Sequence, residues 1–218
     1  MKMGKLAFVV LSMLLVLATG VNAQSLEKRH QIGLRFGMWS QVADTRTVVS
    51  TDGVTTSVGS SGAVGMVAYN YWLKENVALD ISVGGMGVDI ESEVGILGVT
   101  SKFSTIGHIL MGAKYYFPSS TYGSSVRPFA MASVGPFIGD QAETRVGLVV
   151  ATEERTEVAF GGKLAMGVDF PVSRHFMAGL TVGYNFMSDF DEPIGGSDNY
   201  SGPEFLIGVG YLFGSGVN

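Results

Sequence analysis

The chain has 218 residues, of which 46% are hydrophobic and only 15% are charged, with a net charge of −5 and no cysteine. The lack of cysteine excludes disulfides, thiolate chemistry and cysteine-bound metals. With 14 Lys and Arg against 19 Asp and Glu and no basic run, the composition also excludes nucleic acid as an expected partner.

The N-terminus has the pattern of a secretory signal peptide. Lys2 and Lys5 precede an apolar run of 13 residues, Leu6 to Ala18, which is followed by Val21-Asn22-Ala23. This run is shorter than the roughly 20 residues of a membrane-spanning helix, and small residues at its end are typical of a cleavage site. We predict that residues 1–23 are a signal peptide and that residues 24–218 form the mature domain.

Eight segments of the mature domain alternate between apolar residues and small or polar ones. Such alternation predicts strands with two unlike faces, because successive side chains in a strand point to opposite sides. The pattern is clearest in 160–170 and weakest in 127–137, where we predict that Phe129, Met131 and Phe137 face outward. The eight segments are 31–39, 63–72, 77–84, 105–117, 127–137, 160–170, 176–186 and 203–213.

The connections between these segments are alternately long and short. The long ones are 40–61, 87–104, 138–157 and 187–202, and the first can form a hairpin around Thr51-Asp52-Gly53. This order fits antiparallel strands with brief turns at one mouth of a barrel and large loops at the other. Because exported chains enter the periplasm first, we expect periplasmic turns and four outward loops.

Aromatic residues indicate which face of the strands meets lipid. They gather near the short connections and again toward the long ones, as in the two interfacial belts of a membrane barrel. The competing soluble barrel or sandwich would hold its apolar faces inside. We therefore predict an all-β fold, an eight-stranded antiparallel up-and-down transmembrane β-barrel. The expected belts are Tyr69, Tyr71, Tyr115, Phe117, Phe170, Phe176, Tyr211 and Phe213, and Phe137, Phe160, Tyr184, Phe186 and Phe205.

The opposite face of the strands is rich in Gly, Ala, Ser and Thr, with three cations and three anions. In an eight-stranded barrel the interior is just wide enough for side chains to fill, so charges there need partners. We predict a charge network in the lumen and, within it, a salt bridge between Asp80 and Lys114. A structural role is favoured over an ion path. The six residues are Arg35, Asp80, Lys114, Lys163, Asp169 and Glu204.

Two segments of the chain are typical of a known family: Tyr69-Asn70-Tyr71-Trp72-Leu73-Lys74-Glu75-Asn76-Val77-Ala78-Leu79 and Gly112-Ala113-Lys114-Tyr115-Tyr116-Phe117. With these segments the chain resembles the outer-membrane β-barrel domain family. That family includes the membrane domain of outer-membrane protein A and the outer-membrane protein X type. The resemblance extends over residues 24–218. It implies a bacterial outer-membrane location, contact with membrane lipids and lipopolysaccharide, and insertion by the barrel assembly machinery. Roles in such barrels range over anchoring, adhesion and narrow pores.

Two functional hypotheses remain open from the sequence. One is a structural or adhesion-like role carried by the four outward loops; the other is a narrow pore for small solutes or ions. An enzyme is disfavoured, since His108 and Ser104 lie about 13 Å apart along one strand, too far for a nucleophile and its base. We expect no cofactor. The acidic loop residues Asp189, Asp191, Glu192 and Asp198 depart from a calcium-loop pattern and favour a solvated loop over a metal site.

Overall fold

The computed structural model describes residues 25–42, 46–49, 55–58, 61–95, 98–118, 126–146 and 150–214. The predicted signal peptide, residues 1–23, lies outside these ranges, as do residues 51–53 of the expected turn. Within the described ranges, the chain contains no helix whose length and apolar character would let it cross a membrane.

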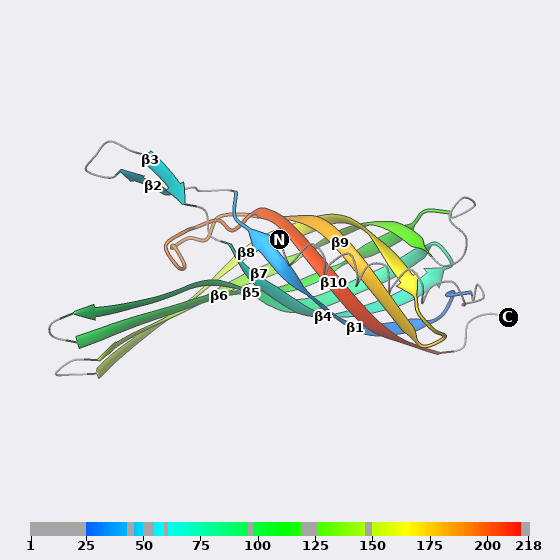
Figure 1. Ribbon diagram of the computed structural model, residues 1–218, viewed down its shortest axis with the longest axis horizontal. Coiled ribbons are helices and arrows are strands. Elements are labelled where there is room, and N and C mark those ends of the chain that lie inside the picture. The colour runs from blue at the N-terminus through cyan, green and yellow to red at the C-terminus, as the bar shows by residue number, and fades with distance from the viewer. Residues whose placement is uncertain are drawn as a thin grey trace, which may run out of the picture.

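Eight strands form one closed antiparallel barrel, which confirms the predicted architecture (Figure 1). The first and last barrel strands pair with each other along ten positions, from His30 and Phe213 to Trp39 and Glu204, and this pairing closes the sheet. The barrel strands are β1 (His30–Ser40), β4 (Ser61–Lys74), β5 (Val77–Gly95), β6 (Gly98–Tyr116), β7 (Arg127–Val146), β8 (Val150–Pro171), β9 (Phe176–Met187) and β10 (Gly202–Phe213). A separate two-stranded sheet, β2 (Arg46–Val49) and β3 (Thr55–Val58), lies within the first long connection.

Four of the strands continue far beyond the barrel wall, contrary to the prediction that 87–104 and 138–157 are loops. β5 pairs with β6 as far as Gly95 and Gly98, β6 with β7 as far as Val99 and Val146, and β7 with β8 as far as Val150. Figure 1 shows these strands as a long four-stranded sheet projecting from one mouth. A register shift between Gly87 and Asp89 marks the point where β5 leaves the barrel. Outside the membrane a strand needs no apolar face toward lipid, so the alternation used for prediction is missing there.

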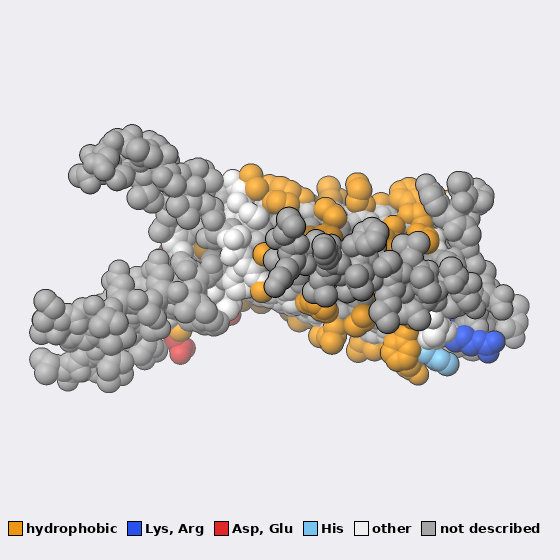
Figure 2. Space-filling model, viewed as in Figure 1, with side chains coloured by type: hydrophobic (Ala, Val, Ile, Leu, Met, Phe, Trp, Pro, Cys, Tyr) orange, Lys and Arg blue, Asp and Glu red, His pale blue; other side chains and the backbone are white. Residues whose placement is uncertain are grey.

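The outward face of the barrel is apolar, as predicted. Leu164, Met166, Ile207 and Val209 all have exposed side chains, so they do not pack in a protein core. Figure 2 shows hydrophobic side chains over the barrel wall. Exposed aromatics lie near both ends of the wall: Tyr115, Phe117, Phe176, Tyr211 and Phe213 toward the short turns, and Phe160, Tyr184, Phe186 and Phe205 toward the long connections. Such a wall is suited to hydrocarbon between two interfaces.

The predicted orientation of β7 is wrong. Phe129, Met131 and Phe137 point into the barrel and are buried, while Val134 is exposed on the outside. Phe129 fits inside because it faces glycine: a Cβ added at Gly167 would lie 2.6 Å from the Phe129 ring. Both faces of β7 carry apolar residues, so the alternation alone could not assign them.

Two residues of the expected aromatic belts, Phe137 and Phe170, are buried. Phe170 of β8 is 6% exposed, and Ala178, its register partner on β9, is buried as well. Phe170 therefore does not form part of the exposed wall.

The lipid-facing wall predicts a strong depth dependence for charged substitutions. Met166 is 68% exposed and pairs with Val182 midway between the aromatic belts, so Met166→Arg should destabilise the folded barrel by about 2–4 kcal/mol. The matched change Val158→Arg, at a position 56% exposed beyond the outer belt, should cost about 0–1 kcal/mol. Urea unfolding in lipid vesicles, followed by tryptophan fluorescence, measures both. Equal costs for the two variants would contradict the membrane position assigned to the wall.

Candidate functional site

The lumen is filled from end to end by three layers of side chains. An apolar cluster lies toward the long connections and includes Trp39, Met86, Ile106, Leu110, Phe137 and Leu206. A second apolar cluster lies toward the short turns and includes Leu26, Trp72, Tyr116, Phe129 and Leu212. Buried polar and charged residues occupy the space between them. The barrel interior is thus a packed core with a polar middle.

The connection between β9 and β10 closes the mouth of the barrel at the end of the long connections, which we call the outer mouth. This segment contributes three buried residues to the apolar cluster near the long connections: Phe190, Ile194 and Tyr200. Gln41 donates a hydrogen bond to Ser197 Oγ at 2.7 Å, which ties the segment to the end of β1. The sequence predicted a solvated acidic loop. Of its four acidic residues, Asp189, Asp191 and Glu192 are exposed and Asp198 is half-buried. The apolar residues among them fold inward as a cap.

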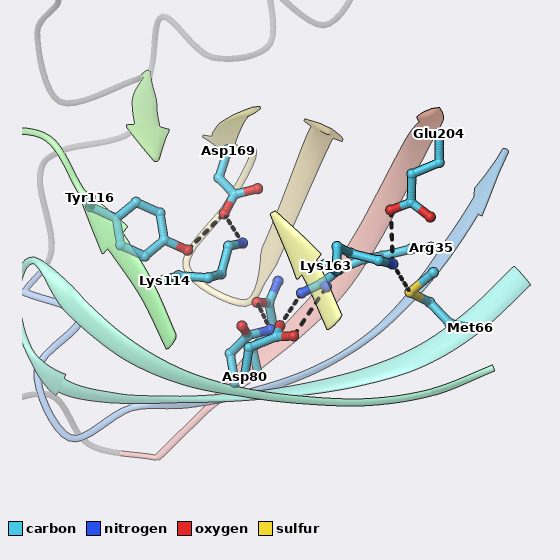
Figure 3. A network of polar contacts seen from close by, with 10 residues as sticks. Arg35, Met66, Asp80, Lys114, Tyr116, Lys163, Asp169 and Glu204 are labelled. Carbon is cyan, nitrogen blue, oxygen red and sulfur yellow. Dashed lines mark hydrogen bonds and ion pairs between the residues drawn. The ribbon is translucent and has the colours of Figure 1, made fainter. Parts of the chain in front are cut away.

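Three ion pairs form the charged middle layer, shown in Figure 3. Arg35 of β1 pairs with Asp80 of β5. Lys114 Nζ of β6 lies 2.9 Å from Asp169 Oδ2 of β8. Lys163 Nζ of β8 lies 2.8 Å from Glu204 Oε1 of β10. All six residues of the predicted network therefore lie in the lumen, paired one cation to one anion.

Neutral partners satisfy much of the remaining hydrogen-bonding capacity of these carboxylates. The Tyr116 hydroxyl donates to Asp169 Oδ2 at 2.7 Å, and Asn185 Nδ2 donates to Glu204 Oε2 at 2.8 Å. The Lys114 ammonium also lies 3.8 Å from the centre of the Phe129 ring, a favourable position for a cation over an aromatic face. Buried charges with this many partners are fixed in place rather than free to move.

The predicted salt bridge between Asp80 and Lys114 is wrong. These residues do lie on adjacent strands, but Asp80 is opposite Gly112 and Lys114 is opposite Ala78. Each instead reaches a residue two strands away around the barrel, Arg35 and Asp169. In a narrow barrel the inward side chains converge, so long side chains meet across the strand that separates them.

Some members of the network were visible in the sequence only as inward polar residues. Tyr116, Asn185 and Asn70 share the inner face, yet alternation alone does not show what they bind. In one orientation of its amide, Asn70 donates to Asp80 Oδ2 at 2.8 Å. A polar residue on the inward face of a barrel strand is the signal that could have identified such partners.

One small cavity lies among the charged residues of the lumen. The cavity lined by Arg35, Asn70, Lys114 and Asp169, among others, has a volume of about 20 Å³, enough for a single water molecule. His108 is buried beside Phe137, and neither of its ring nitrogens has a hydrogen-bond partner among the described residues.

A sequence model of the outer membrane protein β-barrel domain family matches residues 9–213. The chain belongs to this family. The protein is accordingly an outer-membrane β-barrel of bacteria. The apolar wall described above is suited to a lipid bilayer. Proteins of this family lie among lipid and lipopolysaccharide. No curated protein sequence matches the chain.

Solved structures of small outer-membrane barrels share the fold. The attachment invasion locus protein Ail of Yersinia pestis is 14% identical, with a TM-score of 0.50 over 86% of this chain and 99% of Ail. Ail has also been solved with the heparin analogue sucrose octasulfate, with the same identity and coverage. Neisserial surface protein A is 12% identical, with a TM-score of 0.53 over 86% of this chain and 98% of its own. At these identities the likeness establishes the fold alone.

The buried ion pairs predict that removing one partner costs far more than removing both charges. Lys163→Met removes the cation that pairs with Glu204 in the lumen, and should destabilise the barrel by about 3–5 kcal/mol. Adding Glu204→Gln to that variant should restore most of the loss. The exposed pair Arg155–Glu192 is the control, and Arg155→Met should cost about 0–1 kcal/mol. Urea unfolding in vesicles measures the series; no recovery in the double variant would contradict the pairing.

Proposed function

We propose that this outer-membrane protein is a surface-interaction protein, with an adhesion-like role carried by the segments beyond the outer mouth of the barrel. The filled lumen supports this proposal over the alternative of a narrow pore. Two apolar clusters and three ion pairs occupy the path that a solute would follow, and the cap residue Ile194 is fully buried over it.

The projecting sheet carries the proposal. β4 pairs with β5 only as far as Met86, and β9 pairs with β8 only as far as Gly161. Beyond these points, the outer edges of β5 and β8 have no neighbouring strand within the described parts of the chain. Unpaired edge strands present backbone N–H and C=O groups, to which an extended segment of another protein can add. The free part of β5, 89–95, extends on the order of 20 Å.

The charge of the outer segments favours a cationic partner. Segments 87–104, 138–157 and 187–202 contain twelve acidic and three basic residues. Complementary charge steers binding partners, and like charge disfavours them. Ail, which shares the fold, has been solved with a sulfated sugar; the acidic outer segments here support a partner of the opposite sign. The acidic edges also oppose pairing between two copies of this chain.

Further parts of the proposal concern the membrane and the assembly pathway. Lipopolysaccharide contacts are proposed for the outer aromatic belt, since Phe160 and Phe205 are exposed at that end of the wall. Insertion by the barrel assembly machinery is supported by the last strand, which ends on the exposed aromatic Phe213. Catalysis is not part of the proposal, because His108 has no hydrogen-bonded nucleophile in the described structure.

The filled lumen predicts the absence of steady conductance. In planar lipid bilayers the purified protein should show no stable open level on the order of hundreds of picosiemens, because eight strands leave room only for the side chains inside. A reproducible open level of that size, kept after removal of contaminating porins, would support the pore alternative and contradict the proposal.

The sheet edges predict which segments bind host or neighbouring cells. A variant with β5–β6 and β7–β8 cut back to the barrel rim should lose at least tenfold in cell attachment, since about 1.4 kcal/mol of lost contact suffices for that factor. The control removes only β2 and β3. Attachment of bacteria displaying each variant is counted after equal surface display has been verified. Full attachment by the shortened barrel would refute the assignment to the sheet.

A further inference from the structure

The opposite, periplasmic mouth has a basic rim. Among the described residues, five cationic and two acidic side chains lie around the short turns, a net charge of +3 in a chain whose total is −5. Figure 2 shows blue and pale-blue side chains at this end of the barrel. The rim consists of Lys28, Arg29, Lys74, Arg127 and Arg174, with Glu27 and Glu75.

The rim is one connected structure rather than scattered charges. Lys28 N donates to Trp72 O at 2.9 Å, and Arg29 Nη2 donates to Arg174 O at 2.8 Å, so the segment before β1 joins two separate turns. Arg127 pairs with Glu75 at 2.9 Å. The Leu26 backbone N–H donates to the other oxygen of the same carboxylate at 2.9 Å.

Three cations of the rim remain available to a ligand. Lys28, Lys74 and Arg174 are exposed, and none of them forms an ion pair with another described residue. The one exposed acidic side chain of the rim, Glu75, is already held by Arg127 and by Leu26 N–H. Within the part of the chain that the structure describes, no acidic side chain neutralises these three cations.

The rim lies at the level where lipid headgroups meet the barrel. His175, next to Arg174, stacks on Tyr211 with ring centres 5.8 Å apart. His30 stacks on Phe213 at 5.3 Å, and its Nδ1 lies 2.6 Å from the hydroxyl of Tyr69. Exposed aromatic belts mark the boundary between hydrocarbon and headgroups. Cations directly beside such a belt meet phosphate groups rather than bulk solution.

We propose that the periplasmic rim binds the headgroups of anionic phospholipids of the inner leaflet, through Lys28, Lys74 and Arg174. The exposed aromatics of the same end contact the acyl chains, and the cations pair with the phosphate oxygens. A phosphodiester headgroup with a net negative charge is selected over a zwitterionic one, because the latter carries its own ammonium group. This surface is separate from the outer sheet and does not depend on the role proposed for it.

The test compares lipid selection by the native protein and by the triple variant Lys28→Gln, Lys74→Gln, Arg174→Gln. Each protein is reconstituted in nanodiscs of mixed phosphatidylcholine and phosphatidylglycerol and extracted in mild detergent, and its retained lipids are counted by mass spectrometry. We expect enrichment of phosphatidylglycerol on the native protein and about a tenfold lower preference in the triple variant, as three cations near a membrane surface permit. The enrichment should also fall as ionic strength rises.

Two controls keep the result specific. Arg155→Gln removes a cation at the outer end, where Arg155 is exposed and paired with Glu192, and should leave the enrichment unchanged. Inorganic phosphate at constant ionic strength should not displace the lipid, because the acyl chains hold it as well. Equal enrichment in the native and triple-variant proteins, with both folded by circular dichroism, would overturn the proposal. So would loss in Arg155→Gln, or displacement by phosphate alone.

Discussion

Hydrocarbon offers no hydrogen bonds, and this single constraint shapes the molecule. Each backbone N–H and C=O within the membrane must pair inside the protein, so the sheet has to close, and β1 pairs with β10 to do so. Eight strands give a barrel whose interior is only as wide as its side chains. Those side chains must then fill the lumen and neutralise one another, which explains the three buried ion pairs.

The inward position of the charged residues could be predicted, but their pairing could not. Alternation along a strand assigns a face, and it placed Asp80 and Lys114 correctly in the lumen. Choosing partners between adjacent strands is a rule for open sheets. Here each of the three lumen ion pairs skips a strand: β4, β7 and β9 each separate a cation from its anion. Gly183, opposite Glu204, has no side chain, so Lys163 can reach past β9. Such curvature effects depend on closure and are absent from any local pattern.

The predictions for β7 and for the long connections were wrong because, in those segments, the two faces of a strand do not differ in apolar character. On β7, a large aromatic faces inward because the glycine opposite makes room for it, whereas small residues such as Ala132 face lipid. In the segments 87–104 and 138–157, strands persist without alternation because both of their faces leave the membrane. Alternation of apolar and polar residues indicates a strand with an apolar environment on one side only. It therefore identifies the membrane parts of β8 and β10 well, and it does not identify strands that have water on both sides.

The features on which the proposed function rests lie beyond the part of the barrel that must be closed. At the outer boundary β4 and β9 stop pairing near Met86 and Gly161, while β5 to β8 continue. The register shift after Gly87 occurs at the same boundary, and irregularities of this kind redirect a strand. The cap from the β9–β10 connection fills the mouth that the departing strands leave behind. Free strand edges would leave backbone groups without hydrogen bonds in lipid, but outside the membrane water can bond to them. The same chain can therefore hold a sealed core in the membrane and open backbone edges above it, without either requirement weakening the other.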